Sequence, residues 1–277
     1  MVLDNKSVAV ITGAGSGIGR ALALRLVAEG IAGLILSDIS DAGLKSTVEE
    51  CSESGVKVAG RTADVSKLSD IEDLRDFATD NFKSVSHLFN NAGVGLVGRT
   101  EEVSYEDMEW LFGINFWGTV YGTKTFLPLF RDQGFGHIIN ISSVFGLISP
   151  PGQSTYCASK FAVRGFTESL RHELEGANIK VTCVHPGGVR TSIAKSARKG
   201  QNAPEEDKEI APLIFEKVAK TTPDQAASTI IAGVRSDSPR ILIGSDAFQI
   251  SAIQRLFPKR YFKLIDRISG GMLSKFR

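Results

Sequence analysis

The sequence predicts an α/β fold in which helices cover both faces of a doubly wound, parallel β-sheet, within a single domain. Three observations lead to this prediction. Short, apolar, β-branched segments alternate along the chain with segments of helical length. A glycine cluster directly follows the first apolar segment. Polar residues of the kinds that bind ligands follow several of the other apolar segments, where the carboxyl edge of a parallel sheet brings them together.

The order of the segments supports strand–helix–strand units throughout. The predicted strands are short apolar runs at residues 7–12, 33–37, 57–63, 86–89, 137–141, 180–184 and 240–244. The predicted helices are longer runs at residues 20–29, 41–54, 69–81, 104–130, 158–175 and 223–236. Residues 192–222 begin polar and include an apolar patch at 210–218, so we expect an insertion over the site. We predict one catalytic domain at residues 1–247, including this insertion, with residues 248–277 as an extension of the same domain.

Composition excludes several classes of protein. The 277 residues include 32 basic and 31 acidic side chains, and this balance argues against a nucleic-acid binder. No apolar run approaches the ~20 residues that a membrane span needs. Residues 1–7 lack the cationic and apolar regions of a signal peptide, so we expect a cytoplasmic protein. Cys51, Cys157 and Cys183 lack metal or disulfide spacing, and we expect Cys157 and Cys183 to be buried thiols and no metal to be bound.

The glycine cluster predicts a phosphate site. Its spacing is G-x-x-x-G-x-G, formed by Gly13, Gly17 and Gly19 between the first strand and the first helix. Glycines there let the backbone approach a pyrophosphate, and the helix N-terminus offers N–H groups and the positive end of its dipole. A flexible loop without a ligand is the alternative, and the strand–turn–helix context argues against it.

An acidic residue at the end of the second strand indicates which dinucleotide is bound. Asp38 lies 19 positions after Gly19. A carboxylate there accepts hydrogen bonds from ribose hydroxyls and repels a 2′-phosphate, so it favours NAD over NADP. The alternative is a helix N-cap, for which Ser40 and Asp41 are better placed.

A tyrosine and a lysine are spaced for proton transfer. Tyr156 and Lys160 share one face if their segment is helical. A free phenol has a pKa of about 10, and a fixed ammonium nearby favours the phenolate and lowers that value. The pair alone is a weak signal. Asn115 adds to it, because an asparagine inside a predicted apolar helix is unfavourable unless its side chain has a hydrogen-bonding role.

Together these motifs resemble the short-chain dehydrogenase/reductase family over about residues 7–244. The motifs that carry the resemblance occur in the family's order: T-G-x-x-x-G-I-G at Thr12–Gly19, an acid at Asp64, N-N-A-G at Asn90–Gly93, the helix asparagine Asn115, a serine thirteen residues before the tyrosine at Ser143, Y-x-x-x-K at Tyr156 and Lys160, and P-G with a later threonine at Pro186, Gly187 and Thr191. Ser142 adjoins Ser143, so the choice between the two serines depends on spacing. The resemblance implies a Rossmann-type sheet.

The resemblance also implies roles in catalysis. Tyr156 is expected to be the general acid/base and Ser143 to hold the substrate oxygen. Lys160 is expected to lower the tyrosine pKa and bind the nicotinamide ribose, and Asn115 to position a water that links Lys160 to solvent. The residues expected to bind NAD are Gly13, Ser16, Gly17, Ile18, Gly19, Asp38, Ile39, Asp64, Val65, Asn91, Ala92, Gly93, Tyr156, Lys160, Pro186, Gly187, Val189 and Thr191.

We therefore expect an NAD-dependent oxidoreductase acting on an alcohol or ketone, with a catalytically silent nucleotide-binding regulator as the alternative. Apolar residues near the motifs suit a hydrophobic substrate: Val94, Leu96, Val144, Phe145, Leu147 and Ile148. The family commonly forms dimers or tetramers through the helices at 104–130 and 158–175. Their aromatic residues suit burial between subunits, or else fill the monomer core: Phe112, Phe116, Trp117, Tyr121, Phe161 and Phe166.

The last thirty residues, 248–277, combine apolar stripes with interleaved basic residues. We expect two short helices that pack on the body, on a neighbouring subunit or beside the substrate. A basic amphipathic helix lying on a membrane surface is the alternative.

Overall fold

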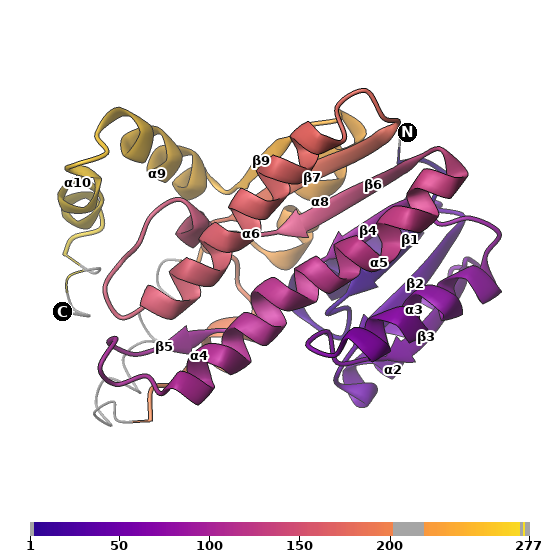
Figure 1. Cartoon of the computed structure of the whole chain (residues 1–277), viewed down its shortest axis with the longest axis horizontal. Coiled ribbons are helices and arrows are strands. Elements are labelled where there is room, and N and C mark those ends of the chain that lie inside the picture. Colours follow the sequence, from indigo (N-terminus) through magenta and orange to yellow (C-terminus); the bar gives the residue numbers. More distant parts are fainter. Residues whose placement is uncertain (1–2, 202–218, 272–273, 275–277) are drawn as a thin grey trace.

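A seven-stranded parallel β-sheet forms the centre of the protein (Figure 1). The structure is a computed structural model that describes residues 3–201, 219–271 and 274. The strand order is β3–β2–β1–β4–β6–β7–β9, so the chain winds outward in both directions from the middle of the sheet. The predicted Rossmann-type fold is confirmed. The order reverses between β1 and β4, which opens a crevice at the carboxyl edge where such sheets bind ligands.

Burial explains why the strands are so apolar. The strands are β1 (Val8–Thr12), β2 (Gly33–Asp38), β3 (Lys57–Thr62), β4 (His87–Asn90), β6 (Gly136–Ile141), β7 (Ile179–Pro186) and β9 (Arg240–Ile243). Every residue of β1, β4 and β6 is buried, because helices cover both faces of the sheet. Edge strand β3 is mostly exposed and accordingly carries polar residues.

Two helical layers cover the sheet. On one face lie α1 (Gly17–Ala28), α2 (Asp41–Ser52) and α8 (Pro223–Arg235), and on the other α3 (Leu68–Asn81), α4 (Tyr105–Phe112), α5 (Gly118–Gln133) and α6 (Ser154–Glu173). Each layer has its own apolar core, to which α1 contributes Leu22 and Leu26, and α5 contributes Phe126 and Phe130. Each such side chain contributes about 1.5–3 kcal/mol by leaving water, so the two cores hold the crevice in a fixed shape.

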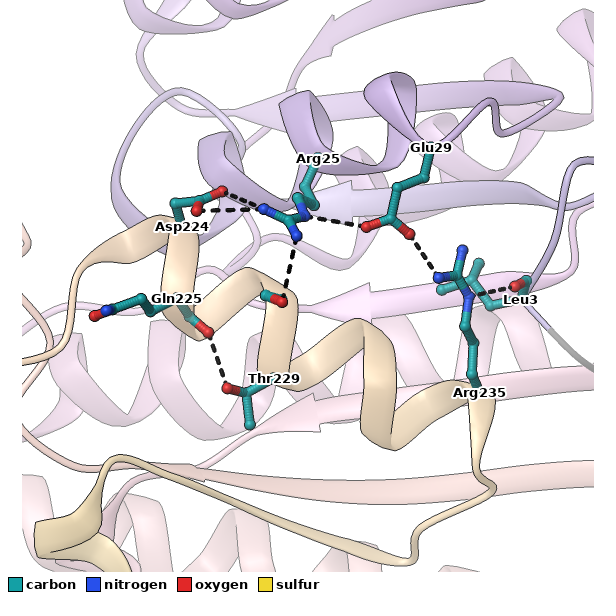
Figure 2. Close-up of polar contacts among 8 residues, drawn as sticks. Leu3, Arg25, Glu29, Asp224, Gln225, Thr229 and Arg235 are labelled. Atoms are coloured by element: carbon teal, nitrogen blue, oxygen red, sulfur yellow. Dashed lines mark hydrogen bonds and ion pairs between the residues drawn. The ribbon is translucent and has the colours of Figure 1, made fainter.

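A chain of ion pairs joins α1 to α8 on the outer surface (Figure 2). The guanidinium of Arg25 lies 3.0 Å from Glu29 and 3.2 Å from Asp224. Glu29 also pairs with Arg235 at 2.6 Å, and Arg235 donates to the carbonyl oxygen of Leu3 at 2.9 Å. Single exposed pairs contribute little, but this network fixes the N-terminal segment and α8 to the helix that begins at the glycine turn.

Two predicted helices differ from the structure. The helix predicted over residues 104–130 is present as a continuous helical run from Tyr105 to Gln133, but it contains a π-helical turn, Gly113–Trp117, between α4 and α5. Such turns often mark functional sites, and this one contains Asn115. The helix predicted from residue 158 begins four residues earlier, at Ser154. Serine and threonine are tolerated in a first turn, whose N–H groups have no intrahelical partners.

The insertion after β7 contains structure that the sequence did not indicate. A 3₁₀ turn (η3, Ser192–Ala194) leads to a short strand, β8 (Arg198–Lys199), which pairs in parallel with β5 (Leu96–Val97). Arg198 fixes this pairing to α4, because its guanidinium stacks 3.7 Å above the Trp110 ring and lies 3.0 Å from Asp107. The apolar patch predicted at residues 210–218 lies outside the described residues.

The C-terminal segment forms two helices, α9 (Ser245–Leu256) and α10 (Tyr261–Ile268), which extend from the end of the molecule opposite β3 (Figure 1). Ile265 is buried, and the backbone N–H of Ser149 donates to the hydroxyl of Tyr261 at 3.4 Å. Throughout the described residues, every helix is too short or too polar to cross a membrane.

Candidate active site

The glycine turn after β1 is pressed against the end of β4. The φ angles of Gly13 and Gly17 are +66° and +53°, a conformation that favours glycine. A side chain at Gly13 would lie 2.7 Å from the Cα of Ala92, and one at Gly19 would overlap the carbonyl oxygen of Gly13. Ser16 is the N-cap of α1, but its side chain makes no capping hydrogen bond, so no capping side chain satisfies the first-turn N–H groups. The turn therefore offers an open backbone cradle at a helix N-terminus.

The Asn-Asn-Ala-Gly segment holds this turn in place. The Asn91 side-chain amide donates to the carbonyl oxygens of Thr12 at 2.9 Å and Gly13 at 3.1 Å. The backbone N–H groups of Asn91 and Ala92 both donate to the Thr12 hydroxyl at 3.1 Å. Asn90 is buried beneath α5 and donates to the side chain of Asn140 at 2.8 Å. The structure thus brings the ends of β1 and β4 together, as their positions in the sequence predicted.

Asp38 faces the glycine turn. One carboxylate oxygen accepts from the backbone N–H of Gly15 and the other from that of Ser40, each at 2.8 Å. The side chain of Ser40 accepts from Gly43, so Ser40 is the N-cap of α2 and the alternative N-cap role for Asp38 is wrong. Ile39 follows with 68% of its surface exposed. A carboxylate and an apolar side chain thus lie together at the end of β2.

Asp64 lies after β3 and is held by its neighbours. Its carboxylate accepts from the backbone N–H of Ser66 at 3.0 Å and from the Ser66 hydroxyl at 2.7 Å. The Lys67 ammonium is 3.8 Å away. Val65 is buried and packs against the backbone of Gly118 at the start of α5. Both residues therefore lie at the carboxyl edge, with their positions set by α3 and α5.

Asn115 projects from the π-helical turn onto the backbone of Val94. Its side-chain oxygen accepts from the Val94 N–H at 2.8 Å, and its side-chain amide donates to the Val94 carbonyl at 3.0 Å. A side chain at Gly93 would lie 3.1 Å from Asn115 Oδ1 and 3.3 Å from Lys160 Nζ. Glycine at this position lets the asparagine and the lysine approach each other, and Asn115 has a hydrogen-bonding role as the sequence suggested.

Tyr156, Lys160 and Ser143 come together where α6 faces the end of β6. The Lys160 ammonium lies 5.9 Å from the centre of the Tyr156 ring and donates to the carbonyl oxygen of Ile141 at 3.1 Å. The Ser143 side chain lies near the Tyr156 hydroxyl, and its own hydroxyl accepts from the backbone N–H of Phe145 at 3.1 Å. Ser142 points elsewhere, because its hydroxyl donates to the Lys160 carbonyl oxygen at 2.8 Å. The geometry thus favours Ser143 over Ser142, in agreement with the spacing.

Burial governs the acidity of this cluster. Burial raises the pKa of Tyr156 to about 12, against the lowering effect of the Ser143 side chain. Burial also lowers the pKa of Lys160 to about 8. At neutral pH the phenol therefore carries its proton and the amine is predominantly charged. Burial opposes the effect expected of Lys160 on the tyrosine, so that expectation stays a prediction.

The loop after β7 completes the crevice. A side chain at Gly17 would lie 3.2 Å from Thr191, so the glycine turn and this loop are neighbours. Val189 is buried and forms a β-bridge with Thr221 across the base of the insertion. The N–H of Gly187 donates to the carbonyl of Ile243 at 2.9 Å. The predicted Pro186–Thr191 segment thus faces the turn after β1.

Two supporting residues escaped the sequence reasoning. The carboxylate of Asp246, in the first turn of α9, accepts from the N–H of Gly188 at 2.7 Å. Gly187 also lies so close to this carboxylate that any side chain there would overlap it. The imidazole of His185 lies 3.0 Å from the carbonyl oxygen of Ser143. In the sequence, the one signal for Asp246 is that an acid lies at the start of the tail. Nothing in the sequence marks His185.

Apolar residues surround the tyrosine on the side away from the glycine turn. The ring of Phe145 meets that of Tyr156 edge-on, with centroids 6.1 Å apart. Val94 and Tyr156 pack against a small cluster that contains Leu96. Four of the six predicted pocket residues are buried, namely Leu96, Val144, Leu147 and Ile148, whereas Val94 and Phe145 are partly exposed. Phe145 is thus the predicted pocket residue whose ring contacts that of Tyr156.

The helix aromatics divide between the core and the surface. Trp117 and Phe161 are 47% and 37% exposed, and the other four are partly buried. Edge-on contacts connect Phe116 to Phe112, Trp117 and Phe166. Phe112, Tyr121 and Phe166 therefore pack against the monomer core, whereas Trp117 and Phe161 present aromatic surface at the start of α5 and on α6.

All three cysteines are buried and free, which confirms the expected burial of Cys157 and Cys183. Burial raises the pKa of Cys157 to about 12.

Comparison with known proteins agrees with this geometry. The family model described as short chain dehydrogenase matches residues 7–202. A relative from Mycobacterium tuberculosis, the putative oxidoreductase SadH, is 43% identical over 260 residues, which are 93% of each chain.

Solved structures share the fold. A short-chain dehydrogenase/reductase from Burkholderia phymatum, in complex with NAD, is 32% identical, with a TM-score of 0.84 over 92% of this chain and 94% of that one. An alcohol dehydrogenase from Thermococcus sibiricus, complexed with 5-hydroxy-NADP, is 26% identical, with a TM-score of 0.73 over 86% and 96% of the two chains. The similar structures thus include proteins that hold either type of nicotinamide dinucleotide.

Proposed function

Because the chain belongs to the short-chain dehydrogenase family, we propose that it is an NAD-dependent oxidoreductase that interconverts a primary or secondary alcohol and the corresponding carbonyl compound. The observation that carries this proposal is the cluster of Ser143, Tyr156 and Lys160 beside an open glycine cradle. A proton donor, a charged neighbour and a dinucleotide site at one sheet edge are what reversible hydride and proton transfer requires.

The residues present fit a bound dinucleotide. The turn of Gly13–Gly19 excludes side chains and carries the first N–H groups of α1, so it would hold the pyrophosphate. Asp38 and Ile39 would contact the adenosine ribose and adenine, together with Asp64 and Val65. The remaining contacts would come from residues on both sides of Tyr156: Asn91, Ala92, Gly93, Lys160, Pro186, Gly187, Val189 and Thr191. The nicotinamide, when bound, supplies or accepts the hydride.

Tyr156 would move the proton. In carbonyl reduction its neutral phenol donates to the substrate oxygen, and the high pKa keeps this proton in place at neutral pH. Ser143 would orient the same oxygen, since its side chain lies near the phenol. The charged amine of Lys160 would stabilise the phenolate that forms. Asn115, which lies across Gly93 from Lys160, would position a water that returns the proton.

The preference for NAD rests on Asp38. Its carboxylate is fixed by two backbone N–H groups at 2.8 Å, so it cannot swing away without losing both hydrogen bonds. A 2′-phosphate brought to the end of β2 would meet this negative charge. The apolar surroundings of Tyr156, which include the ring of Phe145, support a hydrophobic substrate.

Three broader features accompany this function. The aromatic surface at the start of α5 and on α6 supports assembly into a homodimer or homotetramer. The buried free thiols suit a reducing, cytoplasmic environment. The catalytic domain would comprise residues 1–247, with residues 248–277 as its extension.

The test is a panel of primary, secondary, steroid and polyol alcohols, with the matching ketones, assayed with NAD(H) and NADP(H) at 340 nm. We expect turnover of apolar substrates and a higher kcat/KM for NAD. Turnover confined to polar sugars would refute the hydrophobic site. Tight NAD binding without turnover of any substrate would instead favour the nucleotide-binding regulator.

A further inference from the structure

The outer face of α9 carries an apolar stripe that nothing in the described chain covers. Phe248, Ala252 and Leu256 recur every four residues along this face, and Phe257 follows at the end of the helix. Phe248, Leu256 and Phe257 are 60%, 71% and 51% exposed. Together with Ile268 they make up four of the nine large exposed apolar side chains in the described chain. Exposed apolar residues are thus concentrated in residues 245–271, here called the C-terminal arm.

The same segment is strongly basic. Residues 248–277 contain seven of the 32 basic side chains and one of the 31 acidic ones, a net charge of +6, whereas the preceding 247 residues carry −5. Five of these cations lie on the described arm: Arg255, Lys259, Arg260, Lys263 and Arg267. Within residues 3–201, 219–271 and 274, none of the five has an ion-pair partner. The charge on the arm is therefore not neutralised by the body.

The packing of α10 directs these cations outward. Ile265 is buried and Tyr261 contacts the backbone of Ser149, so one side of the helix faces the body. Lys263 and Arg267 are exposed, and they lie four residues apart on the other side. The arm is thus held by the inner side of α10, whose outer side presents cations.

We propose that the C-terminal arm docks on the surface of an anionic lipid bilayer. Exposed aromatic and aliphatic side chains enter the boundary between headgroups and acyl chains, while neighbouring Lys and Arg side chains bind anionic headgroups. The chemistry of the arm matches both layers of such a surface. No described helix is long and apolar enough to cross a membrane, so the contact is peripheral. The proposal does not depend on the oxidoreductase function.

A second copy of the chain is the competing occupant. Outside the arm, the exposed aromatic residues of the described chain are Tyr105 on α4, Trp117 at the start of α5 and Phe161 on α6. These helices lie apart from α9 and α10 (Figure 1). A protein partner would also have to supply carboxylates for five unpaired cations. An anionic membrane supplies that charge without a specific geometry, and it is therefore the occupant that the observations favour.

The experiment is sedimentation of the full chain with phosphatidylcholine vesicles, with and without phosphatidylserine, at low and high salt. We expect binding to the vesicles that contain phosphatidylserine, weakened by salt. The double variant Lys259→Gln/Lys263→Gln should lower the partition coefficient about thirtyfold, because each basic residue contributes about fivefold. Leu256→Gln/Phe257→Gln should also weaken binding. The matched controls Leu68→Gln and Lys83→Glu, at exposed positions outside the arm, should bind like the unaltered chain.

Circular dichroism on the same samples shows whether each variant is folded, and light scattering shows its oligomeric state. Folded variants that bind anionic vesicles as well as the unaltered chain would overturn the proposal. Equal binding to both vesicle types, or binding to neither, would overturn it as well. If Leu256→Gln/Phe257→Gln splits an oligomer while the unaltered chain ignores vesicles, the arm is an interface between copies.

Discussion

Asp246 gives the sharpest test of how the fold supports the site, because it links a tail helix to the loop after β7. Its carboxylate accepts from the Gly188 N–H at 2.7 Å and fills the space beside Gly187. Asp246→Ala leaves that N–H without its charged acceptor. A hydrogen bond to a charged group contributes about 1.5–3 kcal/mol, and because Asp246 is partly exposed, water replaces some of it. We expect a loss of about 1.5 kcal/mol in the stability of this loop.

That loss should appear in cofactor binding. If the loop must regain its conformation to bind NAD, about 1.5 kcal/mol corresponds to roughly a tenfold rise in the Kd for NAD. Calorimetric titration with NAD measures this directly, and kcat at saturating NAD should fall less than kcat/KM. Asp246→Asn is the matched control, because its amide oxygen can still accept from Gly188, and we expect it to retain most of the affinity. An unchanged Kd for NAD in a folded Asp246→Ala variant would show that Asp246 does not hold the loop after β7 for cofactor binding.

Three further predictions concern the site and the core. Asp38→Ala should raise the ratio of kcat/KM for NADP to that for NAD by about tenfold or more. The reason is that repulsion between the Asp38 carboxylate and a 2′-phosphate costs more than ~1.4 kcal/mol. An unchanged ratio would contradict the role of Asp38. Asn115→Ala should lower the free energy of unfolding by about 2 kcal/mol, because the partly buried Val94 N–H and carbonyl both lose their partner. A urea titration that shows a loss below ~1 kcal/mol would argue against this. Burial lowers the pKa of both His87 and His137 from the usual value of 6.5 to about 3. As the pH falls, these histidines take up protons in the unfolded chain before they do so in the folded protein. The free energy of unfolding should therefore drop by about 2 kcal/mol between pH 6 and pH 5. Urea unfolding that gives the same free energy at both pH values would contradict this prediction.

The sheet could be predicted because its signals are local. The β-branched run of Val8–Thr12 fits a strand covered on both faces, and glycine at Gly30 and Gly55 ends helices where a positive φ is needed. The carboxyl edge follows from the parallel order. Asp38 and Asn91 could therefore be placed beside the glycine turn before any tertiary contact was known.

The features that escaped prediction depend on contacts between distant segments. The π-helical turn lets Asn115 reach the backbone of Val94, and its residues read as ordinary helix in sequence. The pairing of β5 with β8 depends on Arg198 stacking on Trp110. Asp246 is an ordinary first-turn acid until the fold places Gly188 against it. Chemical motifs could thus be recognised, whereas the residues that hold them in place could not.

The central claim is that Tyr156 transfers the proton, and the most direct measurement compares Tyr156→Phe with the unaltered enzyme on its best substrate. The variant keeps the ring that packs against Phe145 and removes only the hydroxyl near Ser143. We predict that kcat falls by about 10²–10⁴-fold. The Kd for NAD should stay nearly unchanged. Tyr105→Phe, at a position 82% exposed, is the control and should retain full activity. Turnover by Tyr156→Phe within a few-fold of the unaltered enzyme would contradict the account.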